Sequence, residues 1–219
     1  MFLHGYLSSK ESFYPQINYF SRRFRVTAPD LPGFGGSGPI PAAWSVGEYA
    51  DWLEGFLKER GIVFPCVIAH SFGGRVAIKC LARGLFDRAV LTGCAGIVKK
   101  RTLSYHIRVK SYRLVRKFAP RFAEAKFGSA EYRSLSPLMR ESYKKIVNED
   151  LREEAKRIAR PVLYLNGERD RETPLSSVRI LHECTAGSQL AVLKGCGHFA
   201  HLEEPLLFDL AAEEFLNDA

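Results

Sequence analysis

The stretch Cys66-Val67-Ile68-Ala69-His70-Ser71-Phe72-Gly73-Gly74 decides the fold of this chain. An apolar run of strand length leads up to Ala69, and a pattern with helical spacing begins at Phe72. Ser71 therefore lies on a tight turn between a strand and a helix. Such a turn crowds the backbone and needs small neighbouring residues, which Ala69 and Gly73 supply. The N-terminus of the helix also favours negative charge that develops next to Ser71.

Strand-like and helix-like segments alternate on both sides of this turn. Short apolar runs predict strands at residues 1–3, 24–28, 65–69, 89–92, 161–166 and 189–193. Apolar residues at helical spacing predict helices at residues 10–20, 46–60, 72–83, 176–183 and 203–217. Ser45 and Glu48 have the spacing of a capping box at the start of the second helix. This alternation predicts an α/β fold, a mostly parallel sheet with helices on both faces.

The middle of the chain breaks the alternation, because residues 98–160 indicate several helices with no strands between them. This segment holds 18 Lys and Arg against 7 Asp and Glu, whereas the rest of the chain holds 14 against 17. Apolar residues at helical spacing within it predict an amphipathic helix with a cationic face: Leu103, Ile107, Leu114, Phe118 and Phe122. We expect a core domain of residues 1–97 and 161–219 and a helical lid insertion of residues 98–160.

Length and composition indicate a globular protein of ordinary character. The 219 residues fit one domain with a modest insertion, and 46% hydrophobic and 26% charged residues are usual values. No apolar run approaches the roughly 20 residues that span a bilayer, and the first residues do not have the pattern of a secretory signal. The five cysteines are scattered, without C-x-x-C or zinc spacing. We therefore expect a cytoplasmic protein without a metal site.

Four further motifs accompany the turn at Ser71. They are His4-Gly5-Tyr6, Asp30-Leu31-Pro32-Gly33-Phe34-Gly35-Gly36-Ser37, Gly167-Glu168-Arg169-Asp170 and Gly197-His198. Together with the turn, they resemble the α/β-hydrolase superfamily, in particular its esterase and lipase-like serine hydrolases. The resemblance covers nearly the whole chain outside residues 98–160. It implies an α/β-hydrolase fold shortened at the N-terminus, because the family usually has two strands before the one that ends at His4.

The resemblance assigns the catalytic roles. Ser71 is the nucleophile, His198 the general base and Asp170 the acid that orients the histidine, in the chain order of this fold. A serine hydroxyl needs such a base at neutral pH, and a carboxylate stabilises the imidazolium that forms. The backbone N–H groups of Tyr6 and Phe72 are the implied donors to the oxyanion.

Several candidate residues have alternative interpretations. Glu168 and Glu172 are the other possible acids in the turn that carries Asp170. His201 and Cys196 favour structural roles over chemistry. Asp30 and Ser37 are expected to stabilise their own glycine-rich loop.

We expect hydrolysis of carboxylic esters with short to medium acyl chains, through an acyl-enzyme on Ser71. The expected substrate-binding residues are Phe34, His70, Leu103 and Ile107. The same catalytic groups would serve a C–C bond hydrolase or lyase, or a thioesterase, acting on an anionic substrate. A third hypothesis is a ligand-binding protein without catalysis, which the complete set of catalytic residues disfavours. No cofactor is implied.

The basic segment leaves three interpretations open for its partners. It can be a lid with a solvated cationic face, a helix attracted to an anionic lipid surface, or a pocket for an anionic substrate. Nucleic-acid binding is not expected, because no binding module accompanies the charge. The sequence does not determine the oligomeric state.

Overall fold

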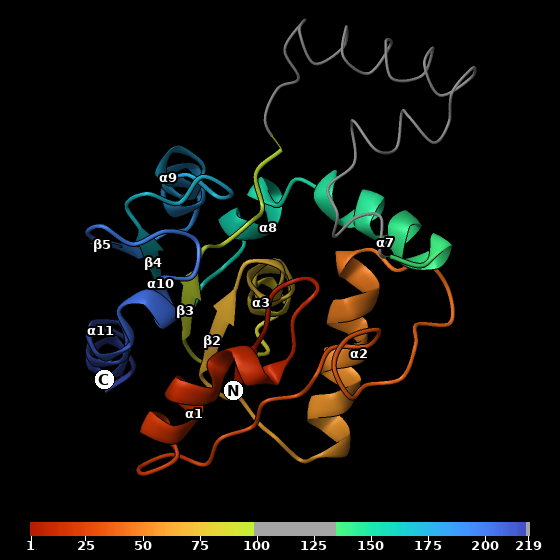
Figure 1. Cartoon of the computed structure of the whole chain (residues 1–219), viewed down its shortest axis with the longest axis horizontal. Helices are drawn as coiled ribbons and strands as arrows, with labels where there is room; N and C mark the ends of the chain where they lie inside the picture. The colour runs from red at the N-terminus through yellow and green to blue at the C-terminus, as the bar shows by residue number, and fades with distance from the viewer. Residues whose placement is uncertain (99–134, 218–219) are drawn as a thin grey trace, which may run out of the picture.

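The computed structural model of the chain describes residues 1–98 and 135–217. Within these residues, five parallel strands form one sheet, and their order in the sheet follows their order in the sequence. The strands are β1 (Phe2–Leu3), β2 (Val67–His70), β3 (Ala89–Thr92), β4 (Val162–Gly167) and β5 (Gln189–Leu193) (Figure 1). The predicted parallel α/β architecture is confirmed.

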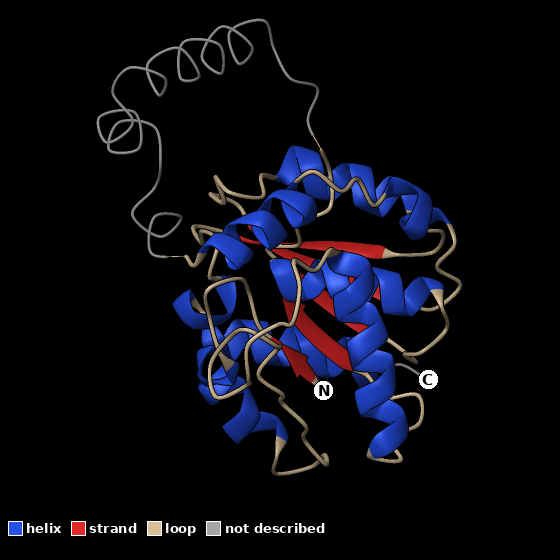
Figure 2. Cartoon of the chain, turned by 90° about the vertical axis from the view of Figure 1, so that its right-hand side faces the viewer, coloured by secondary structure: helices blue, strands red, loops and turns tan. Residues whose placement is uncertain are grey.

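Helices cover both faces of the sheet, as the alternation of segments predicted (Figure 2). One face carries α2 (Val46–Glu59), α3 (Phe72–Ala82), α8 (Arg152–Lys156) and α9 (Leu175–Cys184). The other carries the 3₁₀ helix η1 (Lys10–Phe13), α1 (Tyr14–Phe20), α10 (Ala200–Glu203) and α11 (Pro205–Asn217). The remaining helix of the described residues is α7 (Pro137–Val147).

Successive residues of a strand point to opposite faces of the sheet, and both faces of the sheet are apolar. Phe2 and Ile68 belong to the cluster under α1 and α11, whereas their neighbours Leu3 and Val67 belong to the larger cluster under α2 and α3. A parallel strand covered on both sides must be apolar on both sides, which explains why these strands read as continuous apolar runs.

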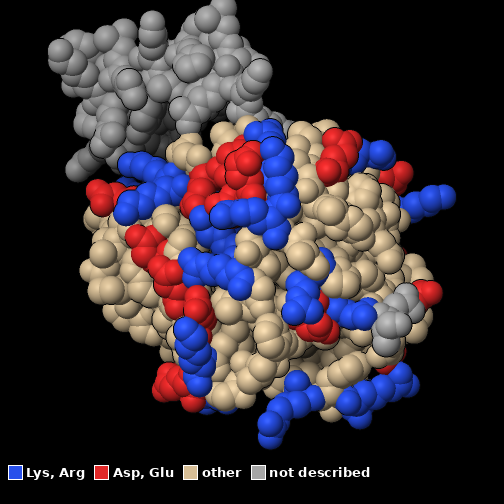
Figure 3. All heavy atoms as spheres, turned by 180° about the vertical axis from the view of Figure 1, so that it is seen from behind, with Lys and Arg blue, Asp and Glu red and all other residues tan. Residues whose placement is uncertain are grey.

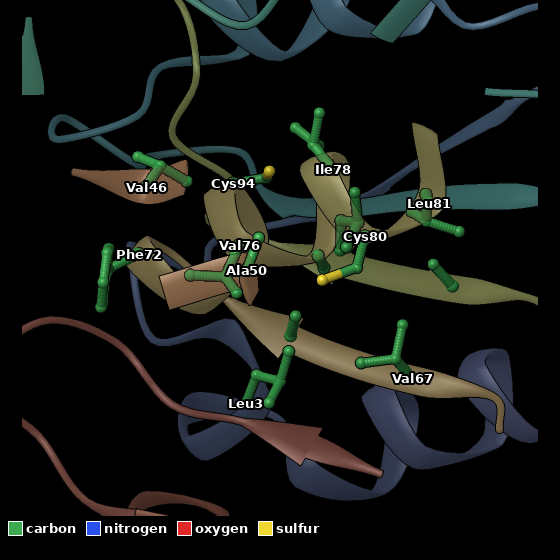
Figure 4. Packing of buried hydrophobic residues seen from close by; sticks show 14 of the residues in the cluster. Leu3, Val46, Ala50, Val67, Phe72, Val76, Ile78, Cys80, Leu81 and Cys94 are labelled. Atoms are coloured by element: carbon green, nitrogen blue, oxygen red, sulfur yellow. The ribbon is translucent and has the colours of Figure 1, made fainter. Parts of the chain in front are cut away.

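Helix α3 fixes the position of the turn at Ser71 through its packing. Its side chains Phe72 and Val76 belong to the same buried cluster as Leu3 of β1 and Ala50 of α2 (Figure 4). Both side chains are buried, and burying a side chain of this size contributes about 1.5–3 kcal/mol. The capping box predicted from Ser45 and Glu48 is present at the start of α2.

Two predicted elements differ from the structure. No strand forms at residues 24–28, where the main chain makes a single sheet-like hydrogen bond, from Phe2 N–H to the Thr27 carbonyl (2.9 Å). Strand β1 has only two residues, so it offers little backbone to pair with. The helix predicted at residues 203–217 begins two residues later, at Pro205, and the separate short helix α10 precedes it, because proline cannot continue α10 and is favoured in a first turn.

Part of the predicted lid insertion packs on the core. Helix α8 contacts α3 and α9, and Leu151 and Ala155 are fully buried there. The Leu151 N–H donates to the Gly96 carbonyl at 2.8 Å. The amphipathic pattern that includes Leu103 and Ile107 lies outside the described residues, and the boundaries 98 and 160 stay a prediction.

The net positive charge of the chain comes from residues outside the described ranges. Residues 99–134 hold 11 Lys and Arg against 2 Asp and Glu, whereas the described residues hold 21 of each. Figure 3 shows acidic and basic side chains interspersed over one face. The described fold is therefore electrically balanced.

Candidate functional site

Ser71 occupies a strained backbone conformation at the carboxyl end of β2. Its φ of 50° and ψ of −107° lie in a region that non-glycine residues rarely adopt, at a cost of about 1–3 kcal/mol. A hydrogen bond from the Ser71 N–H to the Thr92 carbonyl (3.0 Å) holds the turn. A Cβ atom at Gly73 would lie 2.2 Å from the Leu3 carbonyl oxygen, so the turn requires glycine there.

The sheet brings the other predicted site residues to the same edge. Tyr6 follows β1, Asp170 follows β4 and His198 follows β5, and the carboxyl ends of parallel strands are where ligands bind in such sheets. The loops that carry Asp170 and His198 meet at Gly167. A Cβ atom on Gly167 would lie 2.1 Å from the Gly197 carbonyl oxygen, so only glycine lets these loops approach.

Asp170 and His198 form a hydrogen-bonded pair, with His198 Nδ1 donating to Asp170 Oδ2 at 2.9 Å. The carboxylate also accepts from the Glu172 and Thr173 N–H groups at 2.9 Å each and from the Thr173 hydroxyl at 2.6 Å. Burial alone would raise the pKa of Asp170, but the hydrogen bonds from His198 and Thr173 outweigh it and lower that pKa. The acid is thus held ionised beside the histidine.

This pairing fixes the tautomer of His198. Because Nδ1–H donates to Asp170, the neutral ring has no proton on Nε2, which can then accept one. Glu172 Oε2 lies 3.5 Å from Nε2, on the exposed side of the ring. Glu168 instead accepts from the Gly195 N–H at 3.0 Å. Of the three acids considered from the sequence, Asp170 is the one that accepts a hydrogen bond from His198 Nδ1.

Ser71 and His198 both line one cavity of about 600 Å³. Tyr6 and Phe72, the predicted oxyanion residues, line it as well. Phe72 is the first residue of α3, where N–H groups have no acceptor within the helix. Part of the cavity lining comes from the second half of the predicted insertion: Leu135, Tyr143, Ile146 and Val147.

The loop that carries Tyr6 is braced by His4, which is 1% exposed. Nδ1–H of His4 donates to the Gly5 carbonyl at 2.7 Å, and Nε2 accepts from the Leu31 N–H at 2.9 Å. Burial lowers the pKa of His4, which favours the neutral ring that this pattern requires. The first motif is thereby tied to the loop that begins at Asp30.

Asp30 and Ser37 stabilise that glycine-rich loop, as predicted. The Asp30 carboxylate accepts from the Gly36 N–H at 2.8 Å and the Lys10 N–H at 2.7 Å, and the Ser37 hydroxyl donates to the Asp30 carbonyl at 2.6 Å. A Cβ atom on Gly35, whose φ is +52°, would collide with the Asp30 carboxylate. The loop therefore depends on this acid and this glycine.

The four predicted substrate-binding residues differ in where they lie relative to the cavity. His70 lines the cavity, although it is only 2% exposed. Phe34 is buried, with its ring centroid 4.8 Å from that of Tyr6 and 6.0 Å from that of Phe72, and it is absent from the described cavity lining. Leu103 and Ile107 lie outside the described residues.

The sequence interpretation missed Arg75, which lines the cavity and is 6% exposed. Its Nη1 donates to the Glu149 carbonyl at 2.8 Å, and no carboxylate of the described residues lies within salt-bridge distance of the guanidinium. Burial lowers the pKa of this arginine. A buried arginine among the lining residues of a cavity suits an anionic ligand. The spacing of four residues from Ser71, one helical turn, could have indicated it.

The described residues contain no cluster of three or more His, Cys, Asp or Glu that could hold a metal ion. Across the same ranges, no helix is long and apolar enough to cross a membrane.

Comparison with known proteins gives matches over most of the chain. Residues 1–209 match the model of the alpha/beta hydrolase family. A 2-succinyl-6-hydroxy-2,4-cyclohexadiene-1-carboxylate synthase from Salmonella paratyphi B is 30% identical over 233 residues, covering 94% of this chain and 88% of that protein. An esterase from Exiguobacterium antarcticum has a similar structure, with a TM-score of 0.78 and 20% identity over 99% of this chain and 91% of that one. A meta-cleavage product hydrolase from Pseudomonas fluorescens has a TM-score of 0.74 and 24% identity over 99% and 89%.

Proposed function

The chain belongs to the alpha/beta hydrolase family, and we propose that it is a serine hydrolase that cleaves carboxylic esters. The observation that carries the proposal is the convergence of Ser71 and the His198–Asp170 pair on one cavity. A strained serine at a strand-to-helix turn is the arrangement that exposes a nucleophile in this fold.

The proposed reaction has two halves. Ser71 Oγ attacks the acyl carbonyl carbon while His198 Nε2 takes the hydroxyl proton, and the N–H groups of Tyr6 and Phe72 donate to the oxyanion. His198 then gives the proton to the leaving alcohol, and an acyl ester remains on Ser71. Water attacks this ester with His198 as base, which releases the acid and restores the hydroxyl. Each oxyanion donor contributes about 3 kcal/mol in enzymes where it has been removed.

The size and lining of the cavity support a short to medium acyl chain. Its volume of about 600 Å³ also has to hold the alcohol part of the ester. The apolar side chains of Tyr143 and Ile146 give the acyl chain a surface to pack on, and each buried methylene contributes about 0.8 kcal/mol.

A series of p-nitrophenyl esters from acetate to palmitate tests the proposal. We expect turnover that is highest for short to medium chains and is lost in Ser71→Ala. Ser8, another serine among the residues that line the cavity, offers the matched control Ser8→Ala, expected to keep the activity. Equal turnover in wild type and Ser71→Ala would contradict the proposed nucleophile.

Arg75 favours a second candidate, a C–C bond hydrolase or lyase, or a thioesterase, with an anionic substrate. The name of the Salmonella relative describes a carboxylate product, and a buried arginine among the residues that line the cavity is suited to a carboxylate. The Ser71 hydroxyl, with His198 as the base that takes its proton, can equally add to a ketone or thioester carbonyl. This candidate differs from the first in what the substrate must carry, namely a negative charge.

Two esters of similar length separate the candidates: p-nitrophenyl valerate and the p-nitrophenyl monoester of glutaric acid. If Arg75 binds a carboxylate, Arg75→Met raises KM for the monoester by about 10- to 100-fold, since a charged hydrogen bond contributes about 1.5–3 kcal/mol. KM for the valerate should stay within about twofold of wild type on the same argument. Arg83→Met, at the partly exposed end of the same helix, is the control. Equal effects on both esters would remove the anionic candidate.

A further inference from the structure

His70 lies at the junction of the three segments that carry the candidate site. It is the last residue of β2, covalently attached to Ser71, and it is 2% exposed. Its Nε2–H donates to the backbone carbonyl of His198 at 3.0 Å. The strand that carries Ser71 and the loop that carries His198 are thereby joined by one side-chain hydrogen bond.

The opposite side of the His70 ring contacts the loop that carries Tyr6. A Cβ atom placed on Gly5 would lie 2.9 Å from His70 Nδ1 and 3.4 Å from Cε1. Gly5 is therefore the residue that lets the backbone of this loop lie directly against the imidazole. A single ring contacts the segments of the nucleophile, the base and one oxyanion donor.

Neighbouring rings confine the His70 imidazole. Its centroid is 4.7 Å from that of His198, 5.0 Å from that of Phe199 and 4.7 Å from that of His201. His201 is fully buried and packs on Phe13 with centroids 4.8 Å apart. This packing leaves the ring little freedom to turn away from the His198 carbonyl, and it leaves little of its surface for a substrate.

The titratable groups around His70 are His198, His201 and Asp170. Burial lowers the pKa of His70 well below its usual value, and His201 and His198 lower it further, whereas Asp170 opposes this. Burial also lowers the pKa of His201 to about 4. Both rings are therefore neutral at neutral pH, and the one proton of His70 sits on Nε2, where the hydrogen bond requires it.

We propose that His70 is a positioning residue, whose Nε2–H holds the His198 carbonyl and so fixes the candidate base relative to Ser71 and the Gly5 loop. This role differs from the substrate-binding role expected from the sequence, which stays a prediction. The inference rests on the proposed function, because it assigns His70 an effect on the reaction of Ser71 and His198.

Two substitutions separate the hydrogen bond from the ring. His70→Phe keeps a ring but loses the donor, and His70→Gln keeps an N–H donor on a side chain of comparable reach. His201→Phe is the matched control, because it changes a ring that packs on His70, whereas the hydrogen bond to the His198 carbonyl comes from His70. The readouts are kcat and KM for p-nitrophenyl acetate, the rate of labelling by a fluorophosphonate, and amide hydrogen exchange of the segment 195–200.

For His70→Phe we expect kcat and the labelling rate to fall by about 10- to 100-fold with KM nearly unchanged, because small misplacements of catalytic groups have effects of this size. Exchange in the segment 195–200 should accelerate. His70→Gln should recover most of the loss, and His201→Phe should keep wild-type exchange in that segment.

Three outcomes would overturn the inference: a folded His70→Phe variant with wild-type kcat and exchange, equal losses in His70→Phe and His70→Gln, or a rise in KM alone. Failure of the proposed function itself is recognised differently, by absence of labelling and turnover in wild type. In that case the exchange measurement still decides whether His70 holds the loop.

Discussion

Asp209, on α11, has a buried carboxyl group that predicts how the stability of the protein depends on pH. The residue is 3% exposed, and its Oδ1 has no hydrogen-bond partner among the described residues. Burial raises its pKa from 3.8 to about 6, although a hydrogen bond with Gln16 opposes the rise. The ionised form is therefore disfavoured in the folded protein.

The sign of the effect follows from this raised pKa. A group that binds its proton more tightly when folded contributes stability below about pH 4, and this contribution is lost as the pH rises through about 6. The shift of roughly two units corresponds to about 3 kcal/mol at most. Asp209→Asn removes the charge, so it should stabilise the protein by up to about 3 kcal/mol near pH 8 and by less than about 1 kcal/mol near pH 4.

Urea denaturation followed by circular dichroism at the two pH values measures this difference. Glu214→Gln, at an exposed position on the same helix, is the control and should change little at either pH. The reasoning is refuted if Asp209→Asn is less stable than wild type near pH 8, or if its effect is the same at both pH values.

Three other changes have expected outcomes that follow from the structure. Asp170→Asn should lower kcat by about 10⁴-fold, because the amide no longer holds the reactive tautomer of His198; activity near wild type would assign another acid. Gly73→Ala should abolish labelling of Ser71 or shift the melting temperature strongly, because its Cβ would lie 2.2 Å from the Leu3 carbonyl oxygen; a fully active, stable variant would contradict this geometry. The excess charge of residues 99–134 should make the protein sediment with phosphatidylserine vesicles at low salt and release at about 0.5 M NaCl, and no sedimentation at low salt would remove the lipid-surface hypothesis.

The sequence was most informative where local chemistry is restrictive. A serine between an apolar strand and an apolar helix, with glycine two positions later, has few structural interpretations, and Ser71 lies where this pattern placed it. Asp170 and His198 follow strands whose apolar runs were long enough to identify, so their approach at one edge follows from a parallel sheet. These features depend on backbone geometry that short motifs encode.

Features that depend on three-dimensional packing could not be predicted from the sequence. Phe34 lies in a motif of the candidate site, yet its ring fills the space behind Tyr6, because the loop from Asp30 turns it inward. The spacing of Arg75 from Ser71 is one helical turn, but only the fold shows that Arg75 is buried and lines a cavity. The segment 24–28 has strand-like residues, but pairing requires a partner longer than the two residues of β1.

The central claim is that Ser71 is the nucleophile. Intact-mass spectrometry after treatment with a fluorophosphonate, followed by peptide mapping, measures it most directly. The account predicts one adduct on wild type, located on Ser71, the same adduct on Ser8→Ala, and none on Ser71→Ala. An adduct on another residue, or one that persists in Ser71→Ala, would contradict it.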